Sequence, residues 1–429
     1  MNTTAPVSRR PPPTHAAVLC SLASCTLLFC ASASHADAVT DWNAIMQDTA
    51  HSASPDPAQW ARTAAITQVA VFEAVNTIVG DYEPYRAEID APPEASAQAA
   101  AIAAAHRALA TLHPEKAPQL DAARDKSLAA IADGKRKGDG IAVGIAAADA
   151  IVALRANDGF DAPAPYTPGT NPGEYRSTPP DHSPAFRPGL GKVATFVIRN
   201  ASEFRSAPPP SLRSKRYTRD FTEVKRVGEM HSAERPEDRT RVARFYDATD
   251  ADGIYYPAAR QLIATRSRTL SQNARLFALL SMAIWDSAVA CFETKYHFNV
   301  WRPVTAIREA NSDGNHRTEP DANWLSAVFT PPFPAYPSGH ASFGGAARAV
   351  LEAEFGPDGH AITLTNPALP DIVLHYETFK QITDDIDEAR VYGGVHYRFD
   401  QEAGAAQGRR VGEYVLRRAL RPACGHDRK

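Results

Sequence analysis

Apolar residues recur every three or four positions along most of this 429-residue chain, and this helical spacing limits the folds open to it. Asp56-Pro57 is a favourable helix start, and Gly80 is a suitable stop. Between them one face carries Ile66, Val69, Phe72, Val75 and Val79. Further helices are predicted from about Glu94 to Leu112 and from Gly140 to Arg155. No alternating strand pattern and no long internal repeat occurs, so the chain is predicted to be mostly α.

Proline divides the chain into regions. Eleven of the 34 prolines lie between residues 160 and 210, where regular helix is hard to sustain. Interleaved aromatic residues such as Tyr175 and Phe196 favour a segment packed over a core, and a disordered linker is the alternative. The predicted regions are a leader at 1–36, an N-terminal helical region at 37–159, a Pro-rich irregular segment at 160–215 and a C-terminal helical region at 216–429.

The first 36 residues resemble a signal peptide. Arg9 and Arg10 precede an apolar, small-residue run that ends near Ser34-His35-Ala36. The alternatives are a first core helix and a lipoprotein site at Cys25. We expect export to the periplasm or the exterior. Only Cys291 and Cys424 would remain after cleavage, and they permit one disulfide without establishing it.

Charge and hydropathy exclude some classes of partner. The formal net charge is -3 and the pI is about 6.5, so no basic excess indicates nucleic acid binding. The most apolar segment of the mature chain, LFALLSMAIWDSAVACF, is interrupted by Asp286 and is too short to cross a bilayer comfortably. We therefore expect a protein with no membrane span.

Three short motifs carry the candidate chemistry. In KYHFNVWRP, Lys295 and Arg302 are seven residues apart, so both could face one point if the preceding helix continues that far. Taken alone, two solvated surface cations are the simpler interpretation.

The second motif is PPFPAYPSGHASFGG. Pro337 can end an extended approach, and Ser338-Gly339-His340 begins a helical run. Main-chain N–H groups, a hydroxyl and the positive end of a helix dipole favour an anion, and His340 can exchange protons with it. A plain capped helix explains the motif about as well.

The third motif is ARVYGGVHYRFDQEAG. Arg390 precedes His396 by six residues, and Asp400 follows it by four, after the Gly393-Gly394 break. A carboxylate at that spacing can fix the imidazole tautomer and raise its basicity. His396 is therefore a candidate nucleophile or ligand, although a lone oriented histidine is more often a core residue.

Together the motifs supply three cations, a Ser-Gly amide corner and two histidines. Three buried cations would repel one another without an anion, so the combination predicts a receptor for a tetrahedral, multiply charged oxyanion.

The ordered motifs Lys-x6-Arg-Pro, Pro-Ser-Gly-His and Arg-x5-His-x3-Asp resemble the superfamily that joins vanadium-dependent haloperoxidases, type 2 phosphatidic acid phosphatases and bacterial acid phosphatases. They span Lys295 to Asp400, about a quarter of the chain. The wider frame is similar to the exported bacterial branch of the haloperoxidases. Ala389 departs from the usual serine at its position, which removes a hydroxyl but no charged contact.

The resemblance implies an all-α fold of paired helical bundles and a role for each motif residue. His396 would bond the central atom of the anion, with Asp400 behind it, and His340 would be the acid–base residue. The oxygens of vanadate or phosphate would be bound by Lys295, Arg302, Ser338, Gly339 and Arg390. Asp286 is a weaker candidate for holding an arginine, and a surface or N-terminal-turn carboxylate is its simpler interpretation.

The resemblance leads to two enzymatic hypotheses. The first is a vanadate-dependent haloperoxidase that uses hydrogen peroxide to oxidise halide, giving hypohalous acid or an equivalent that halogenates an organic acceptor. The second is an acid phosphatase that hydrolyses phosphomonoesters through a phosphohistidine. The flanks of the motifs favour the peroxidase, and Phe333 resembles the aromatic of chloroperoxidase-type members. A noncatalytic oxyanion-binding protein is a third hypothesis, and packing is the favoured role of His297.

Overall fold

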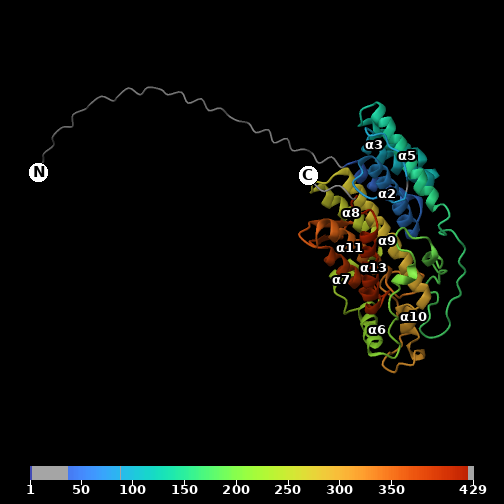
Figure 1. Cartoon of the computed structure of the whole chain (residues 1–429). Coiled ribbons are helices and arrows are strands. Elements are labelled where there is room, and N and C mark those ends of the chain that lie inside the picture. The colour runs from blue at the N-terminus through green and yellow to red at the C-terminus, as the bar shows by residue number, and fades with distance from the viewer. Residues whose placement is uncertain (2–36, 87, 424–429) are drawn as a thin grey trace. The chain divides into compact units, whose positions relative to one another are not determined.

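The computed structural model describes Met1 and residues 37–86 and 88–423 (Figure 1). The predicted signal peptide beyond Met1 and the second mature cysteine, Cys424, lie outside the described residues. Cys291 is buried and forms no disulfide with another described residue. A pairing with Cys424, which the sequence permits without establishing, lies outside the described residues.

The described residues form thirteen α-helices, four short 3-10 helices and one two-stranded antiparallel sheet, so the chain is all-α as predicted. The α-helices are α1 (Ala38–Ala53), α2 (Pro57–Val79), α3 (Ala97–Leu112), α4 (Ala117–Ala129), α5 (Lys135–Arg155), α6 (Lys215–Val227), α7 (Glu237–Asp247), α8 (Ala251–Ala264), α9 (Leu270–Phe298), α10 (Pro303–Arg308), α11 (Gly339–Phe355), α12 (Phe379–Tyr392) and α13 (Arg398–Arg418). The short elements are η1 (Pro114–Lys116), η2 (Leu190–Lys192), η3 (Ala201–Phe204), η4 (Ala310–Ser312), β1 (Ile362–Thr365) and β2 (Val373–Tyr376).

The first predicted helix is confirmed in detail. Asp56 caps α2 by accepting a hydrogen bond from the Ala58 N–H, Pro57 is its first residue, and Gly80 ends it in a left-handed conformation at φ 77°. The third predicted helix, α5, begins at Lys135, five residues earlier than predicted. The hairpin of β1 and β2 is not predicted by the spacing, because four-residue strands are too short to show an alternating pattern.

Helix α9 joins the N-terminal helices to the C-terminal ones. It packs against α1 and α2 on one side and against α11 and α13 on the other, as Figure 1 shows. Within the described part of the chain, α9 alone has the length and composition to cross a membrane. However, 94% of its most apolar stretch is buried in the protein, which is typical of a core helix.

Helices α11 and α13 approach closely because small residues line their contact. A Cβ atom on Gly408 would lie 1.7 Å from the Ser342 carbonyl oxygen, and one on Gly404 would lie 2.5 Å from the Ser338 oxygen. Ala341 and Ser342, the small residues that follow His340, lie against these two glycines. The contact places the first turn of α13 beside the start of α11.

The Pro-rich stretch between α5 and α6 packs onto α9. Asp286, in the middle of α9, accepts hydrogen bonds from the N–H groups of Phe196, Val197 and Ile198 at 2.6, 2.8 and 2.9 Å. Burial raises the pKa of Asp286 to about 6. Both interpretations of Asp286, as a surface carboxylate and as a holder of an arginine of the motif, were therefore wrong. It fastens an irregular segment to the core helix.

Candidate active site

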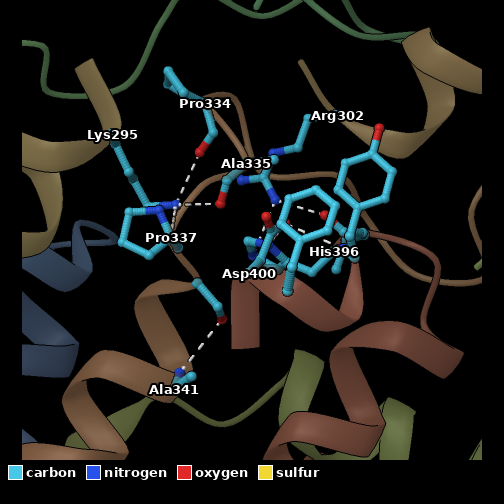
Figure 2. Close-up of polar contacts among 12 residues, drawn as sticks. Lys295, Arg302, Pro334, Ala335, Pro337, Ala341, His396 and Asp400 are labelled. Carbon is cyan, nitrogen blue, oxygen red and sulfur yellow. Dashed lines mark hydrogen bonds and ion pairs between the residues drawn. The ribbon is translucent and has the colours of Figure 1, made fainter. Parts of the chain in front are cut away.

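Lys295 lies fully buried in the last turn of α9. Its Nζ donates hydrogen bonds to the carbonyl oxygens of Pro334 at 2.8 Å, Ala335 at 3.0 Å and Pro337 at 2.5 Å (Figure 2). An ammonium group has three N–H donors, so the loop uses all of them. Burial lowers the pKa of Lys295 to about 7, because desolvation opposes the charged form. Lys295 therefore holds the loop and brings a titratable positive charge to this place.

Arg302 and Lys295 lie near each other for a different reason from the one predicted. Helix α9 ends at Phe298, and Asn299 adopts a left-handed conformation at φ 52°, so the two cations do not share one helical face. They still converge on Phe333. The Lys295 Nζ lies 4.9 Å and the Arg302 guanidinium carbon 4.8 Å from its ring centroid. Both cations therefore face one aromatic ring, and the loop that carries it lies between them.

The Arg302 guanidinium ties three segments together. Its Nε donates to the Phe333 carbonyl oxygen at 2.8 Å, and Nη1 donates to the Val395 carbonyl at 2.8 Å and to His396 Nε2 at 3.1 Å. Its Nη2 is buried and has no hydrogen-bond partner among the described residues. Burial lowers the pKa of Arg302 to about 10, so the side chain stays charged at neutral pH.

The Ser338-Gly339-His340 motif begins α11, as predicted. The Ser338 side chain accepts a hydrogen bond from the Ala341 N–H at 3.4 Å, and the Ser338 N–H donates to the Asp400 carbonyl oxygen at 2.9 Å. The first N–H groups of a helix have no partners within it, so they can receive an anion.

His340 is neutral in this environment. Burial lowers its pKa well below the ordinary value, and the charges of Arg390, Lys295 and Arg302 lower it further. The nearby Tyr246 carbonyl favours the protonated form but does not outweigh these effects. A neutral imidazole can accept a proton from a bound molecule.

Arg390 lies in the last turn of α12 with its side chain buried. Its Nη1 donates to Asp247 Oδ1 at 3.2 Å and to the Tyr246 carbonyl at 3.3 Å. Its Nε is buried and unpartnered within the described part of the chain. Arg390 is thus the second guanidinium with a spare donor.

His396 is oriented by Asp400, as the spacing predicts. His396 Nδ1 lies 2.8 Å from Asp400 Oδ2, which also accepts the Tyr397 N–H at 3.1 Å. Burial and the cations Arg302, Lys295 and Arg390 lower the pKa of His396 well below the ordinary value. The neutral ring then donates from Nδ1, which leaves a lone pair on Nε2. Burial also raises the pKa of Asp400 to about 7, although the Lys295 charge opposes this.

Comparisons with known proteins find relatives in sequence and in fold. Residues 275–425 match the family model described as the VCPO second helical-bundle domain. Over 285 residues the chain is 27% identical to the vanadium chloroperoxidase of Curvularia inaequalis. The chain is a relative of the vanadium-dependent haloperoxidases. The resemblance inferred from the three motifs is thus confirmed.

The alignment with the Curvularia haloperoxidase covers 50% of this chain and 46% of that protein, so it spans less than half of the relative's length. The structure of the first bacterial vanadium-dependent iodoperoxidase matches with a TM-score of 0.77 and 24% identity, over 89% of this chain and 96% of that one. The holo form of a bacterial vanadium-dependent chloroperoxidase matches with a TM-score of 0.67 and 20% identity, over 87% and 97%. These structures show that the haloperoxidase fold is shared.

The donor set suits an oxyanion such as the vanadate of these haloperoxidases. Arg302 Nη2 and Arg390 Nε are buried donors that lack a partner in the described residues. The lone pair of His396 Nε2 accepts a hydrogen bond from Arg302 Nη1, which a bound anion would replace. Lys295, Arg302 and Arg390 bring three positive charges to the site, where Asp247 pairs with Arg390 and Asp400 with His396. No group of three or more His, Cys, Asp or Glu side chains that could hold a metal cation occurs within the described ranges. The residues therefore fit an anion that is held by hydrogen bonds and that one histidine approaches at its central atom.

A cavity of about 390 Å³ opens onto this site. Gly339, His340, Arg390 and His396 line it, whereas Lys295, Arg302 and Ser338 are not part of its lining. His297, two residues beyond Lys295, is exposed and packs edge-on against Phe298.

Sequence reasoning missed the other walls of the cavity. Pro57, Ala58 and Ala61 come from α2, and Asp250 and Asp252 come from the start of α8. Their positions depend on how the N-terminal helices pack on α9, and no local motif signals that. The Asp247 partner of Arg390 also carries no sequence signal beyond its charge.

Proposed function

We propose that this protein is a vanadate-dependent haloperoxidase, which oxidises halide with hydrogen peroxide. The observation that carries the proposal is the pair of spare guanidinium donors, Arg302 Nη2 and Arg390 Nε, beside an oriented and neutral His396. Buried donors without partners are costly, so a site of this kind is expected to have an acceptor ligand.

In this proposal the anion is held by charge and hydrogen bonds. Arg302 and Arg390 donate to its oxygens, and the hydroxyl of Ser338 and the N–H of Gly339 add donors at the start of α11. His396 would bond the central atom through Nε2, in place of its hydrogen bond from Arg302 Nη1, and Asp400 would keep the Nδ1 proton in place. Lys295 adds positive charge from behind the loop. Phosphate can occupy the same site.

Bound vanadate supplies Lewis acidity without a change of oxidation state. His340, which is neutral and faces the cavity, accepts a proton from hydrogen peroxide as it binds and returns it to the departing oxygen. The positive charge of Lys295, Arg302 and Arg390 stabilises negative charge that develops on oxygen. In sum, one hydrogen peroxide, one halide and one proton give one hypohalous acid and one water.

The proposal is tested by bromination of a reporter diketone. Metal-free mature protein is assayed with hydrogen peroxide and bromide, with and without orthovanadate. We expect turnover only with orthovanadate, loss of turnover in His340→Ala, and loss of vanadate binding in His396→Ala. His297→Ala is the matched control and keeps both properties, since His297 is exposed and lies outside the cavity.

The alternative, an acid phosphatase, uses the same residues, with His396 Nε2 as the nucleophile and His340 protonating the leaving oxygen. Folded protein that gives no bromination with orthovanadate but hydrolyses p-nitrophenyl phosphate would replace the haloperoxidase proposal with this one.

A further inference from the structure

The cavity in front of His340 has a size and a lining that suit an organic molecule. Its volume of about 390 Å³ lies in the range of small-molecule sites, roughly 300–1,000 Å³. Phe329 is 52% exposed, so the aromatic lining of the cavity continues to the surface of the protein. The aromatic side chains of the lining are Phe186, Tyr256, Phe292, Phe329, Phe333 and Phe343.

One wall of the cavity carries three carboxylates. Asp247 pairs with Arg390 at 3.2 Å, and Asp252 Oδ2 lies 2.5 Å from His51 Nε2. Asp250 differs from both. It is the N-cap residue of α8, but its side chain makes no capping hydrogen bond, and it has no hydrogen-bond or ion-pair partner among the described residues.

Charges of both signs surround Asp250. Burial has the largest effect and raises the pKa of Asp250. The negative charges of Asp252 and Asp247 raise this pKa further, whereas the positive charges of Arg390 and His51 lower it. Since Arg390 and His51 already face Asp247 and Asp252, Asp250 is the carboxylate on this wall that lacks a counter-ion. A positively charged group entering the cavity would supply one.

We propose that the cavity binds the organic acceptor of the reaction, and that this acceptor is an electron-rich arene with an alkylammonium side chain, whose ammonium pairs with Asp250 while its ring lies among the phenylalanines. The inference rests on the proposed haloperoxidase function for its chemistry. It adds the substrate class, which the oxyanion site alone does not specify.

The charge and the lining of the cavity both favour this class of acceptor. An ammonium beside a partly desolvated carboxylate is favoured, whereas an anionic acceptor would meet Asp250 without compensation. The aromatic walls offer stacking and edge contacts to a flat ring. The ring would face His340 and His396, which lie in the same lining.

Halogenation of the acceptor is an electrophilic substitution on its ring. The π electrons of the acceptor ring form a bond to the halogen of the hypohalous equivalent, and the oxygen–halogen bond breaks with its electrons on oxygen. The ring then loses a proton, which joins the departing hydroxide to give water. Hydrogen peroxide is thus the oxidant, and a ring C–H bond is replaced by a carbon–halogen bond.

The first test is binding without peroxide. Isothermal titration calorimetry at pH 8, with phosphate-saturated protein, compares three phenols: tyramine, the neutral 4-ethylphenol and the anionic 3-(4-hydroxyphenyl)propanoate. We expect tyramine to bind about tenfold more tightly than 4-ethylphenol, as for one ion pair, and the propanoate to bind most weakly.

The second test is Asp250→Asn. The Kd of tyramine should rise about tenfold, whereas that of 4-ethylphenol should change less than twofold. Asp358→Asn is the matched control: it removes the same charge from an exposed turn after α11 that does not line the cavity. Equal binding of all three phenols, or unchanged tyramine affinity in Asp250→Asn, would overturn the inference.

Competition in the wild-type protein gives a measurement that needs no variant. Tyramine and 4-ethylphenol are brominated together, either by the enzyme or by added hypobromous acid. We expect the enzyme to favour tyramine more than the free oxidant does, and equal product ratios would contradict the inference. The calorimetry needs neither vanadate nor turnover, so failure of the haloperoxidase proposal can be distinguished from failure of this one.

Discussion

Replacing Arg302 by lysine separates the guanidinium fork from its positive charge. The substitution keeps one cation, but an ammonium cannot occupy the positions of Nε, Nη1 and Nη2 together. In the structure Nε donates to the Phe333 carbonyl and Nη1 donates to the Val395 carbonyl and to His396, whereas Nη2 has no partner among the described residues. Arg302→Lys therefore tests whether the spare donor holds the anion.

The expected size of the effect follows from the contacts. A hydrogen bond to a charged group contributes about 1.5–3 kcal/mol, so loss of the Nη2 donor should raise the vanadate Kd about 10- to 150-fold. Leaving a buried carbonyl of Phe333 or Val395 without its donor costs about 1–3 kcal/mol, so the free energy of unfolding should fall as well. Both effects have the same direction.

The two quantities are measured separately. Equilibrium dialysis gives the vanadate Kd, and urea unfolding of the metal-free protein gives stability. Arg308→Lys is the control, because Arg308 also donates from Nε to a backbone carbonyl, that of Trp324, at 2.8 Å. If Arg302→Lys stays folded and binds vanadate within twofold of the wild type, the assignment of Nη2 to the anion is wrong.

Three further predictions concern charge, packing and processing. Burial lowers the pKa of Lys295 to about 7, so its charge is present below that pH and lost above it. The wild type should therefore bind vanadate more tightly than Lys295→Met at pH 6, and this difference in Kd should shrink as the pH rises to 8.5. Gly408→Ala, whose Cβ would lie 1.7 Å from the Ser342 oxygen, should destabilise by about 3 kcal/mol in urea, whereas Gly138→Ala, with open space around it in α5, should stabilise by about 0.5–1 kcal/mol. We also propose export, with cleavage after Ala36, because Asp37 caps α1 by accepting a hydrogen bond from the Thr40 N–H at 2.8 Å. Mass spectrometry of the exported protein should show a chain that begins at Asp37, and a chain that begins after Ala38 would contradict this.

The sequence predicts those parts of the site whose geometry is local. The four-residue step from His396 to Asp400 gives the 2.8 Å contact directly, and Ser338 caps α11 where the motif places it. Such features depend on a few neighbouring residues and on helix geometry, so a pattern is enough to find them.

Features that depend on how distant segments pack could not be predicted. Lys295 and Arg302 have the spacing of one helical face, but α9 ends between them, and the loop of Phe333 brings them together instead. Asp286 has no partner near it in sequence, and its three donors come from a segment about ninety residues away.

The Pro-rich loop and the buried lysine account for each other. Proline has no N–H group, so a chain such as Pro334-Ala335-Tyr336-Pro337 cannot form a regular hydrogen-bond ladder, and its buried carbonyls need donors from elsewhere. Lys295 supplies these donors, and the three carbonyls offset part of the cost of burying an ammonium. For the oxyanion, Lys295 is then a charge whose donors are already in use, whereas Arg302 and Arg390 have donors without a partner in the described part of the chain. Removal of either arginine should therefore weaken vanadate binding more than removal of the lysine, which should instead loosen the loop that positions Ser338.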